Sequence, residues 1–318
     1  MNNLNLTHIP VLKKETIKFL NIKKDGIYID CTFGFGGHSK EILKNLNENG
    51  ILYAIDKDPY SINVAKKIKD HRFHIIPGNF SKILKSFQQK KIQRKVDGIL
   101  FDLGMSSMQV NDPNRGFSFL LDGPLDMRMD PKKGITAHSW LIKSNKQLIS
   151  KVLYEFGEER FAKKIALKIV KQRKNRPIER TSELSNLISK IVPRNKKHPA
   201  TRTFQAIRIY INKELDELKI ALKYVFNILK NRGRLLIITF NSLEDRIVKN
   251  FMSKNSKLAS VPYGLAINET QLKSLQEIKL KIIGKIIPTK SEIKNNPRAR
   301  SAILRVSEIQ NIYEQKHL

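Results

Sequence analysis

The stretch Asp30-Cys-Thr-Phe-Gly-Phe-Gly-Gly-His-Ser39 decides the fold of this chain. An apolar run at 26–30 leads into it and a helical pattern at 39–46 follows it, so its three glycines separate a strand from a helix. Glycine lets the backbone turn tightly at such a point and approach a ligand closely. The stretch therefore predicts the first strand–loop–helix unit of a parallel α/β sheet, with a ligand at the loop.

The spacing of the glycines bears on which ligand this is. A dinucleotide-binding fingerprint requires glycine at 34, 36 and 39, but position 39 is serine. Instead, Asp30 precedes the loop, and the adjacent glycines Gly36 and Gly37 close it. This form favours S-adenosylmethionine, whose amino-acid end has no diphosphate to be cradled, over a nicotinamide cofactor.

The same alternation continues on both sides of the loop. Strands are predicted at 26–30, 51–55, 73–76, 96–101, 233–240 and 302–306, the last as an edge strand, and helices at 39–46, 59–68 and 80–87. Strands alternating with helices of this length predict βαβ units and a doubly wound, Rossmann-like sheet. A further helix is predicted after the strand 233–240, with Ser242 and Asp245 forming its capping box.

Polar residues follow the predicted strands where a ligand would bind. Asp56 ends the second strand, where a carboxylate can accept both ribose hydroxyls, although it could instead cap the helix that starts near Pro59. Phe80 follows the third strand and could pack on adenine or belong to the core. Asp102 ends the fourth strand and is expected to face the same crevice.

The middle of the chain has a different pattern. Residues 104–134 are rich in Gly, Asp, Pro and Met and are predicted to form a long ordered loop. Residues 139–191 have helical periodicity throughout, and one further helix is predicted from about Ala200 to Val225. We therefore expect an α/β domain over 1–113 and 206–318, interrupted by an inserted all-helical domain over 114–205.

The charge of the chain points to a polyanionic partner. Among 318 residues, 60 are Lys or Arg and 29 are Asp or Glu, which gives a net charge of +31. Such an excess favours phosphate contacts with nucleic acid, although a compositional bias toward lysine would produce the same balance. The basic run Lys171–Arg176 could likewise be an RNA-binding segment or a solvated face.

Several classes of protein are excluded by composition. The single cysteine, Cys31, rules out an intramolecular disulfide and a cysteine-cluster zinc site, and no histidine pair has metal-ligand spacing. No apolar run approaches the roughly 20 residues that cross a bilayer, and the N-terminus lacks a signal-peptide pattern. We expect a cytoplasmic protein with no membrane partner and no metal.

Motifs along nearly the whole chain resemble those of one family, the bacterial 16S rRNA cytosine-N4-methyltransferases. They are His8–Leu12, Gly36–Ser39, Asp102–Ser107, Arg115–Phe119, Asp122–Asp130, Gly157–Phe161, His198–Gln205, Ser242–Arg246 and Asn296–Ser301. The resemblance implies transfer of a methyl group from S-adenosylmethionine to the exocyclic amine of a decoding-centre cytidine in 16S rRNA, within the small ribosomal subunit. It also implies that the inserted helical domain recognises the substrate.

The resemblance also assigns roles to single residues. The cofactor-binding residues would be Gly34, Gly36, Gly37, His38, Asp56, Phe80, Asp102 and Gln109. Two positions depart from the family pattern, since Phe35 stands where relatives usually have Arg and Asn241 where they have His. The first departure could alter how the loop meets cofactor or RNA, and the second removes a group that could titrate.

The catalytic and RNA-binding groups are less sharply defined. Asp102 and Asp126 are candidates to accept a hydrogen bond from the cytosine amine, although Asp126 could equally pair with Arg128 to hold the loop. The candidate RNA contacts are Arg128, Arg202, Gln205, Arg208 and Asn241, and the middle three form a polar stripe with Asn212. The alternative function is a non-catalytic basic RNA-binding factor in ribosome assembly.

Overall fold

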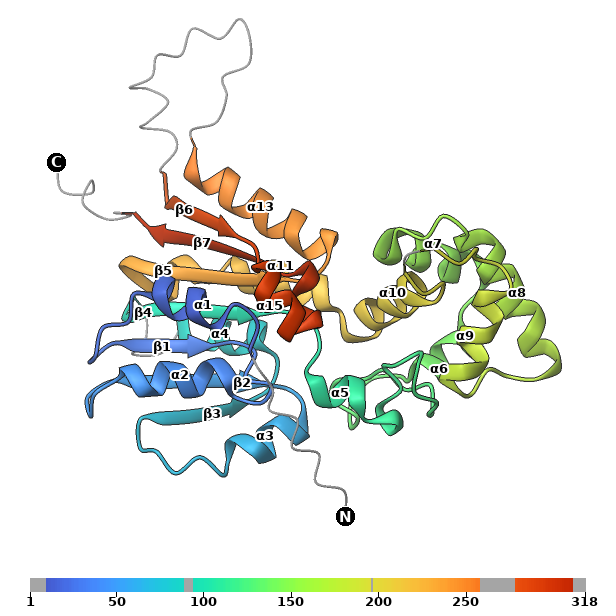
Figure 1. Cartoon of the computed structure of the whole chain (residues 1–318), viewed down its shortest axis with the longest axis horizontal. Coiled ribbons are helices and arrows are strands. Elements are labelled where there is room, and N and C mark those ends of the chain that lie inside the picture. The colour runs from blue at the N-terminus through green and yellow to red at the C-terminus, as the bar shows by residue number, and fades with distance from the viewer. Residues whose placement is uncertain (1–9, 89–93, 196, 258–277, 311–318) are drawn as a thin grey trace, which may run out of the picture. The chain divides into compact units, whose positions relative to one another are not determined.

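A computed structural model describes residues 10–88, 94–195, 197–257 and 278–310 (Figure 1). The contacts divide the chain into two compact units. Unit 1 comprises Met1–Gly104 and Glu217–Leu318, and unit 2 comprises Met105–Asp216. The boundaries expected from the sequence, at 113/114 and 205/206, fall inside unit 2, because the segments on either side of them pack with the helical unit. Asn212, for example, donates a hydrogen bond to the carbonyl of Met127.

Unit 1 is built on a seven-stranded sheet in the order β3-β2-β1-β4-β5-β7-β6. The strands are β1 (Ile27–Asp30), β2 (Ile51–Asp56), β3 (Phe73–Pro77), β4 (Val96–Asp102), β5 (Leu229–Thr239), β6 (Leu280–Ile286) and β7 (Ile303–Ile309). All pairings are parallel except those of β7, which runs antiparallel to both β5 and β6.

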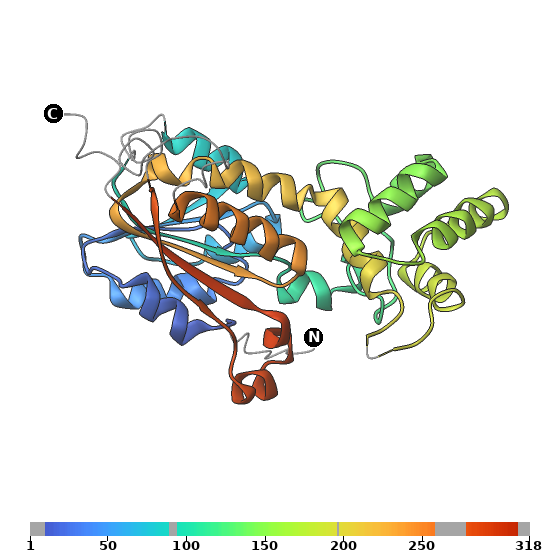
Figure 2. The ribbon, with the colours of Figure 1, turned by 90° about the horizontal axis from the view of Figure 1, so that it is seen from above.

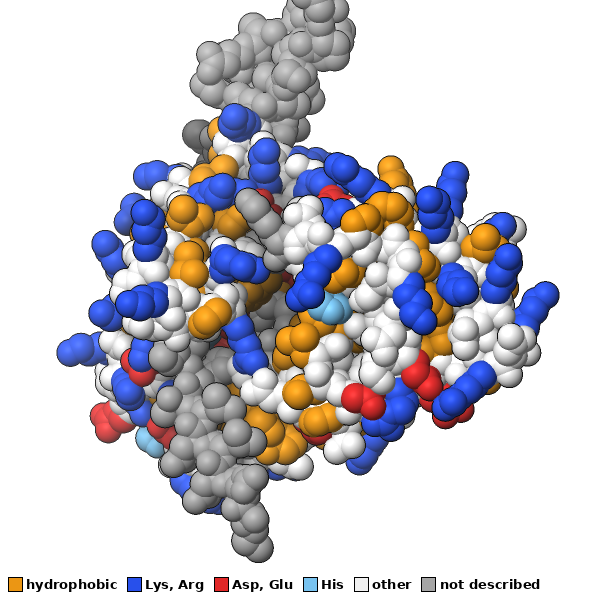
Figure 3. All heavy atoms as spheres, turned by 45° about the vertical axis from the view of Figure 1, so that its right-hand side comes forward, with side chains coloured by type: hydrophobic (Ala, Val, Ile, Leu, Met, Phe, Trp, Pro, Cys, Tyr) orange, Lys and Arg blue, Asp and Glu red, His pale blue; other side chains and the backbone are white. Residues whose placement is uncertain are grey.

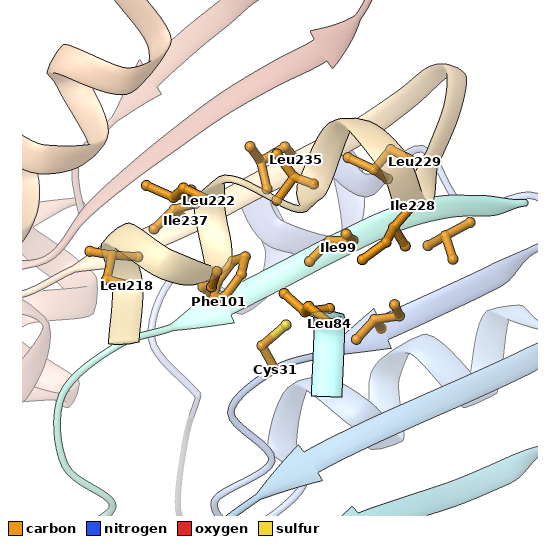
Figure 4. Packing of buried hydrophobic residues seen from close by; sticks show 14 of the residues in the cluster. Cys31, Leu84, Ile99, Phe101, Leu218, Leu222, Ile228, Leu229, Leu235 and Ile237 are labelled. Carbon is orange, nitrogen blue, oxygen red and sulfur yellow. The ribbon is translucent and has the colours of Figure 1, made fainter. Parts of the chain in front are cut away.

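Helices cover both faces of this sheet (Figures 1 and 2). They are α1 (Lys13–Leu20), α2 (Gly37–Asn45), α3 (Pro59–Ala65), α4 (Phe80–Gln88), α11 (Glu214–Leu222), α12 (Val225–Ile228) and α13 (Ser242–Ser256). The short α15 (Lys290–Asn295) lies in the connection between β6 and β7, and none of its residues is buried. Side chains alternate between the two faces along each strand, so Leu235 and Ile237 pack with α4, α11 and α13 (Figure 4), whereas Leu236 and Ile238 pack with α1, α2 and α3. The predicted doubly wound Rossmann-like sheet is confirmed.

Two predictions about this unit are wrong. The segment 302–306 is not an edge strand, because β7 pairs on both sides and the edge is β6, which lies in a stretch without clear periodicity. The single helix predicted from Ala200 to Val225 is broken at Lys213, whose φ of 52° is left-handed and ends α10 (Thr201–Asn212). The apolar spacing continues across the break, so periodicity alone could not show it.

Unit 2 is helical and has its own core. After the short α5 (Ser107–Asn111) and the 3-10 turn at Pro113–Arg115, its helices are α6 (Ala137–Lys143), α7 (Lys146–Gly157), α8 (Ala162–Asn175), α9 (Thr181–Ser189) and α10. Trp140, Ile149, Ile165 and Leu184 contribute one side chain each from α6 to α9 to this core. The helical pattern predicted over 139–191 is confirmed. None of the helices in the described ranges is both long and apolar enough to cross a membrane.

Candidate functional site at the carboxyl edge of the sheet

The order of the strands reverses between β1 and β4, because the chain runs outward from β1 to β2 and β3 before it returns to β4. In open α/β sheets, ligands bind outside the carboxyl ends of the strands at such a reversal. Asp30 ends β1, Asp56 ends β2 and Asp102 ends β4. The topology therefore brings three carboxylates to one edge of the sheet.

Gly36 and Gly37, in the loop after β1, are required by the packing of the chain itself. Gly36 has a φ of 71° and forms the cap of α2, and a Cβ there would lie 2.6 Å from the ring of Phe33. A Cβ on Gly37 would lie 2.3 Å from Pro10. These glycines thus bring the start of α2 close to its neighbours, whether or not a ligand also contacts the loop.

Backbone amides from the loops after β1 and β2 hold the carboxylate of Asp56 in place. Its Oδ2 accepts a hydrogen bond from the amide of Gly34 at 2.8 Å, and its Oδ1 accepts one from the amide of Asp58 at 2.9 Å. The cap of α3 is Asp58, which accepts from the amide of Tyr60, so the alternative role of Asp56 as a helix cap is wrong. Burial raises the pKa of Asp56 to about 6, despite these two hydrogen bonds.

Asp30 is a site residue that the sequence analysis did not assign. It is 1% exposed and accepts hydrogen bonds from Ser39 Oγ at 2.7 Å and from the amide of Thr32 at 3.1 Å. Burial raises its pKa, and the hydrogen bond from Ser39 opposes that rise. Its position at a strand end, like that of Asp56, was the available signal. Ser39 stands where a dinucleotide fingerprint would have its third glycine, and here it binds the carboxylate.

His38 is buried beside Asp30, which is also buried, and Asp102, which is partly exposed. Its ring is 5% exposed, and Nε2 lies 3.5 Å from Asp102 Oδ2, which is within ion-pair range but long for a hydrogen bond. Burial lowers the pKa of His38, but Asp102 and Asp30 raise it by more, so the net shift is upward. Within the described residues, both ring nitrogens of His38 and Oδ1 of Asp102 lack hydrogen-bond partners.

Phe80 is the first residue of α4, directly beyond β3. Its ring packs edge-to-face on Phe101, with the centroids 5.5 Å apart, and it belongs to the periphery of the core. The ring is only partly buried, so packing on adenine and membership of the core are compatible.

In unit 2, Gln109 and Asp126 make contacts with a structural role. Gln109 Oε1 accepts a hydrogen bond from the amide of Ser106, and Ser106 Oγ accepts one from the amide of Gln109, which together cap α5. Asp126 accepts hydrogen bonds from Arg128 Nε at 2.8 Å and Nη2 at 2.7 Å. This pairing is the structural alternative considered for Asp126 and Arg128, and it occupies both carboxylate oxygens.

The polar stripe expected on α10 is divided among different partners. Arg202 is exposed and donates to the carbonyl of Glu158, whereas Gln205 is partly buried and donates to the carbonyl of Phe156. Arg208 is 8% exposed and makes two hydrogen bonds to Glu214. RNA would have to displace Glu214 to reach Arg208, so the stripe is not a continuous free surface.

Asn241 is the N-cap of α13. Its Oδ1 accepts hydrogen bonds from the amides of Leu243 and Glu244, and Glu244 in return accepts one from the amide of Asn241. The capping box thus begins one residue before Ser242, and the predicted pairing of Ser242 with Asp245 is wrong. Asp245 instead accepts two hydrogen bonds from Arg305 on β7.

Comparison with known proteins identifies the family. The model of the MraW methylase family matches residues 5–310. Curated relatives named ribosomal RNA small subunit methyltransferase H include one from Buchnera aphidicola subsp. Baizongia pistaciae, 60% identical over 96% of this chain and 98% of its own. Another, from Buchnera aphidicola subsp. Acyrthosiphon pisum, is 58% identical over 98% of this chain and 100% of its own.

Among solved structures, an rRNA methylase from Streptococcus thermophilus matches with a TM-score of 0.40 at 10% identity, covering 96% of this chain and 100% of that chain. The match of the family model over nearly the whole sequence carries the assignment. This chain belongs to the MraW methylase family.

Proposed function

We propose that this chain is an S-adenosylmethionine-dependent methyltransferase that methylates the exocyclic N4 amine of a decoding-centre cytidine in 16S rRNA. The observation that carries the proposal is the set of carboxylates, Asp30, Asp56 and Asp102, at the carboxyl ends of β1, β2 and β4. Membership of a methylase family supports the reaction class, and the names of the relatives support small-subunit rRNA as the substrate.

The residues at this edge fit the proposed cofactor. Asp56 presents a carboxylate, already oriented by two amides, to the ribose hydroxyls. Phe80 offers a partly exposed ring to the adenine, and the loop at Gly36 and Gly37 lets the chain approach the amino-acid end. Oδ1 of Asp102 is buried and has no hydrogen-bond donor within the described residues, which costs free energy. The ammonium group at the amino-acid end of the cofactor would supply such a donor.

The main task of the protein in this reaction is to position the cytosine amine and the cofactor relative to each other. When bound, S-adenosylmethionine supplies a methyl group on a positively charged sulfur. The N4 lone pair of cytosine is delocalised into its ring, so the base must be extracted from the RNA and held with its amine in line with that methyl group. Attack of the amine on that methyl group would form a carbon–nitrogen bond as the carbon–sulfur bond breaks, and the methylated amine would then lose a proton to water.

Of the two candidates to accept a hydrogen bond from the cytosine amine, we propose Asp102. Its side chain is 22% exposed at the end of β4, so it can accept a hydrogen bond at the edge of the sheet. Asp126 is a weaker candidate, since both of its oxygens bind Arg128. Arg202 and Gln205 are better candidates for RNA contact than Arg208, because each donates to a backbone carbonyl, whereas Arg208 is buried and bound to Glu214.

We expect the protein to act in the cytoplasm. The test is methylation of small ribosomal subunits, taken from a strain that lacks the endogenous activity, with isotopically labelled cofactor. Mass spectrometry of the nucleosides should find label in N4-methylcytidine. Binding of the subunit without transfer of label would instead favour the non-catalytic assembly factor. Label in another nucleoside would contradict the proposed acceptor while leaving the reaction class in place.

A further inference from the structure

Unit 2 contains a groove between α8 and α9 that the proposed methyl-transfer site does not use. Its volume is about 290 Å³, and the polar side chains lining it include Lys168, Gln172, Arg176, Glu183, Asn186 and Lys190. We refer to it as the α8–α9 groove. The buried side chains of Ile178 and Leu187 also line it, so the polar groups stand on a packed apolar base.

The charge of this groove is strongly one-sided. The sequence of α8 has six basic residues and no acidic residue. Glu183 is the one carboxylate lining the groove, and it is paired with Arg176 at 3.2 Å. Lys168 and Lys190 are exposed, and no carboxylate of the described residues forms an ion pair with either. Figure 3 shows further Lys and Arg side chains spread over one face of the molecule.

The basic run Lys171–Arg176 does not act as one surface. Arg173 donates from Nη1 to the carbonyl of Ser144 at 2.6 Å and also to that of Leu141, so it fastens the end of α6. Arg176 is engaged by Glu183. In the groove, the cations open to a ligand are therefore Lys168 and Lys190 rather than Arg176.

We propose that the α8–α9 groove binds the sugar–phosphate backbone of one RNA strand. The two lysines suit phosphates, and the exposed amides of Gln172 and Asn186 can donate to and accept from ribose 2′-hydroxyls. This inference rests on the proposed function, since it names a second contact with the same rRNA substrate. It adds an anchoring site to the methyl-transfer site at the carboxyl edge of the sheet.

The test compares two charge-neutralising double variants. Lys168→Gln/Lys190→Gln removes the two groove charges, and Lys67→Gln/Lys69→Gln removes two exposed lysines that follow α3 in unit 1. Binding of a 16S rRNA fragment is measured from 50 to 300 mM salt. Each lysine in contact with a single strand contributes a slope of about 0.7 in log Kd against log salt. The groove variant should lose about 1.4 of that slope and bind about tenfold more weakly at low salt, whereas the control should change little.

Other outcomes separate the alternatives. Equal slopes for the two double variants would overturn the proposal and make the groove lysines a solvated face. Weaker binding to assembled small subunits with unchanged binding to naked RNA would also overturn it, in favour of an acidic ribosomal protein as the partner. Lys168→Arg/Lys190→Arg should retain the slope. Since RNA binding is measured without methyl transfer, a failure of the proposed reaction would not be mistaken for a failure of the groove.

Discussion

At the scale of the residue, Asp56 links the loop after β1 to the proposed ribose site. We expect Asp56→Ala to weaken binding of S-adenosylhomocysteine by roughly 1.5–3 kcal/mol, as a hydrogen bond to a charged acceptor is lost. Asp56→Asn keeps the shape of the side chain but cannot accept from both amides. Isothermal titration calorimetry measures the affinity, and circular dichroism checks the fold. Unchanged affinity in a folded variant would remove Asp56 from the site.

The raised pKa of Asp56 adds a dependence on pH. With a pKa of about 6, the carboxylate is mostly ionised at pH 7.5 and mostly protonated at pH 5. The ionised form is the better acceptor for ribose hydroxyls, so affinity should fall as pH falls through 6, by up to about tenfold at pH 5. Asp56→Asn cannot ionise, so its affinity should change less over the same range. An equal pH dependence in both proteins would assign the titration to another group, such as His38.

Asn241 is a residue whose observed role is in the helix rather than in chemistry. Loss of its cap in Asn241→Ala should lower the free energy of unfolding by about 1 kcal/mol, whereas Asn241→Asp should retain it. Chemical denaturation measures both. Asn241→His should change single-turnover methylation by less than tenfold, because the amine proton can leave to water. A hundredfold gain of activity in that variant would instead indicate that a general base is required at this position.

At the scale of the element, the sequence predicted the helices and strands whose apolar residues follow a regular local pattern. The strands from β1 to β4 and the helices of unit 2 have clear periodicity, and both were found. The edge strand was misplaced because β6 and β7 pair with each other far from β5 in sequence, and no local pattern encodes that order. The partners of Arg208 and Asp245 are likewise set by tertiary contacts, so side chains that looked free or locally capped proved to be engaged.

Two neighbouring cations on α8 test this distinction between local pattern and tertiary contact. Arg173→Ala should lower the free energy of unfolding by roughly 1.5–3 kcal/mol, because the carbonyls of Leu141 and Ser144 lose a charged donor. Lys174→Ala removes the same charge from an exposed position and should cost less than about 0.5 kcal/mol. Thermal and urea denaturation of both variants measures the difference. Similar losses would mean that helix α8 responds to charge in general rather than to the contact with α6.

At the scale of the whole molecule, each unit has a core of its own. The two clusters that sandwich the sheet belong to unit 1, and a third cluster belongs to unit 2. The proposed cofactor residues from Gly34 to Asp102 lie in unit 1, whereas the α8–α9 groove lies in unit 2. The sequence predicted Asp56 and Asp102 as site residues because the position rule for α/β sheets is general, although Asp30 was not assigned by the same rule. The groove could not be predicted, since Lys168 lies on α8 and Lys190 directly follows α9, and their proximity is set by the packing of the two helices.

This division predicts that salt affects the two ligands differently. With a net charge of +31, the protein should bind rRNA largely through phosphate contacts, and raising salt from 50 to 200 mM should weaken that binding by about a thousandfold if six or more phosphates are contacted. Binding of S-adenosylhomocysteine carries no such release of counterions and should change by less than about threefold. Fluorescence anisotropy with an rRNA fragment and calorimetry with the cofactor product provide the two measurements. A shallow salt dependence for RNA would mean that the excess of lysine reflects composition, because charges that do not contact phosphate release no counterions.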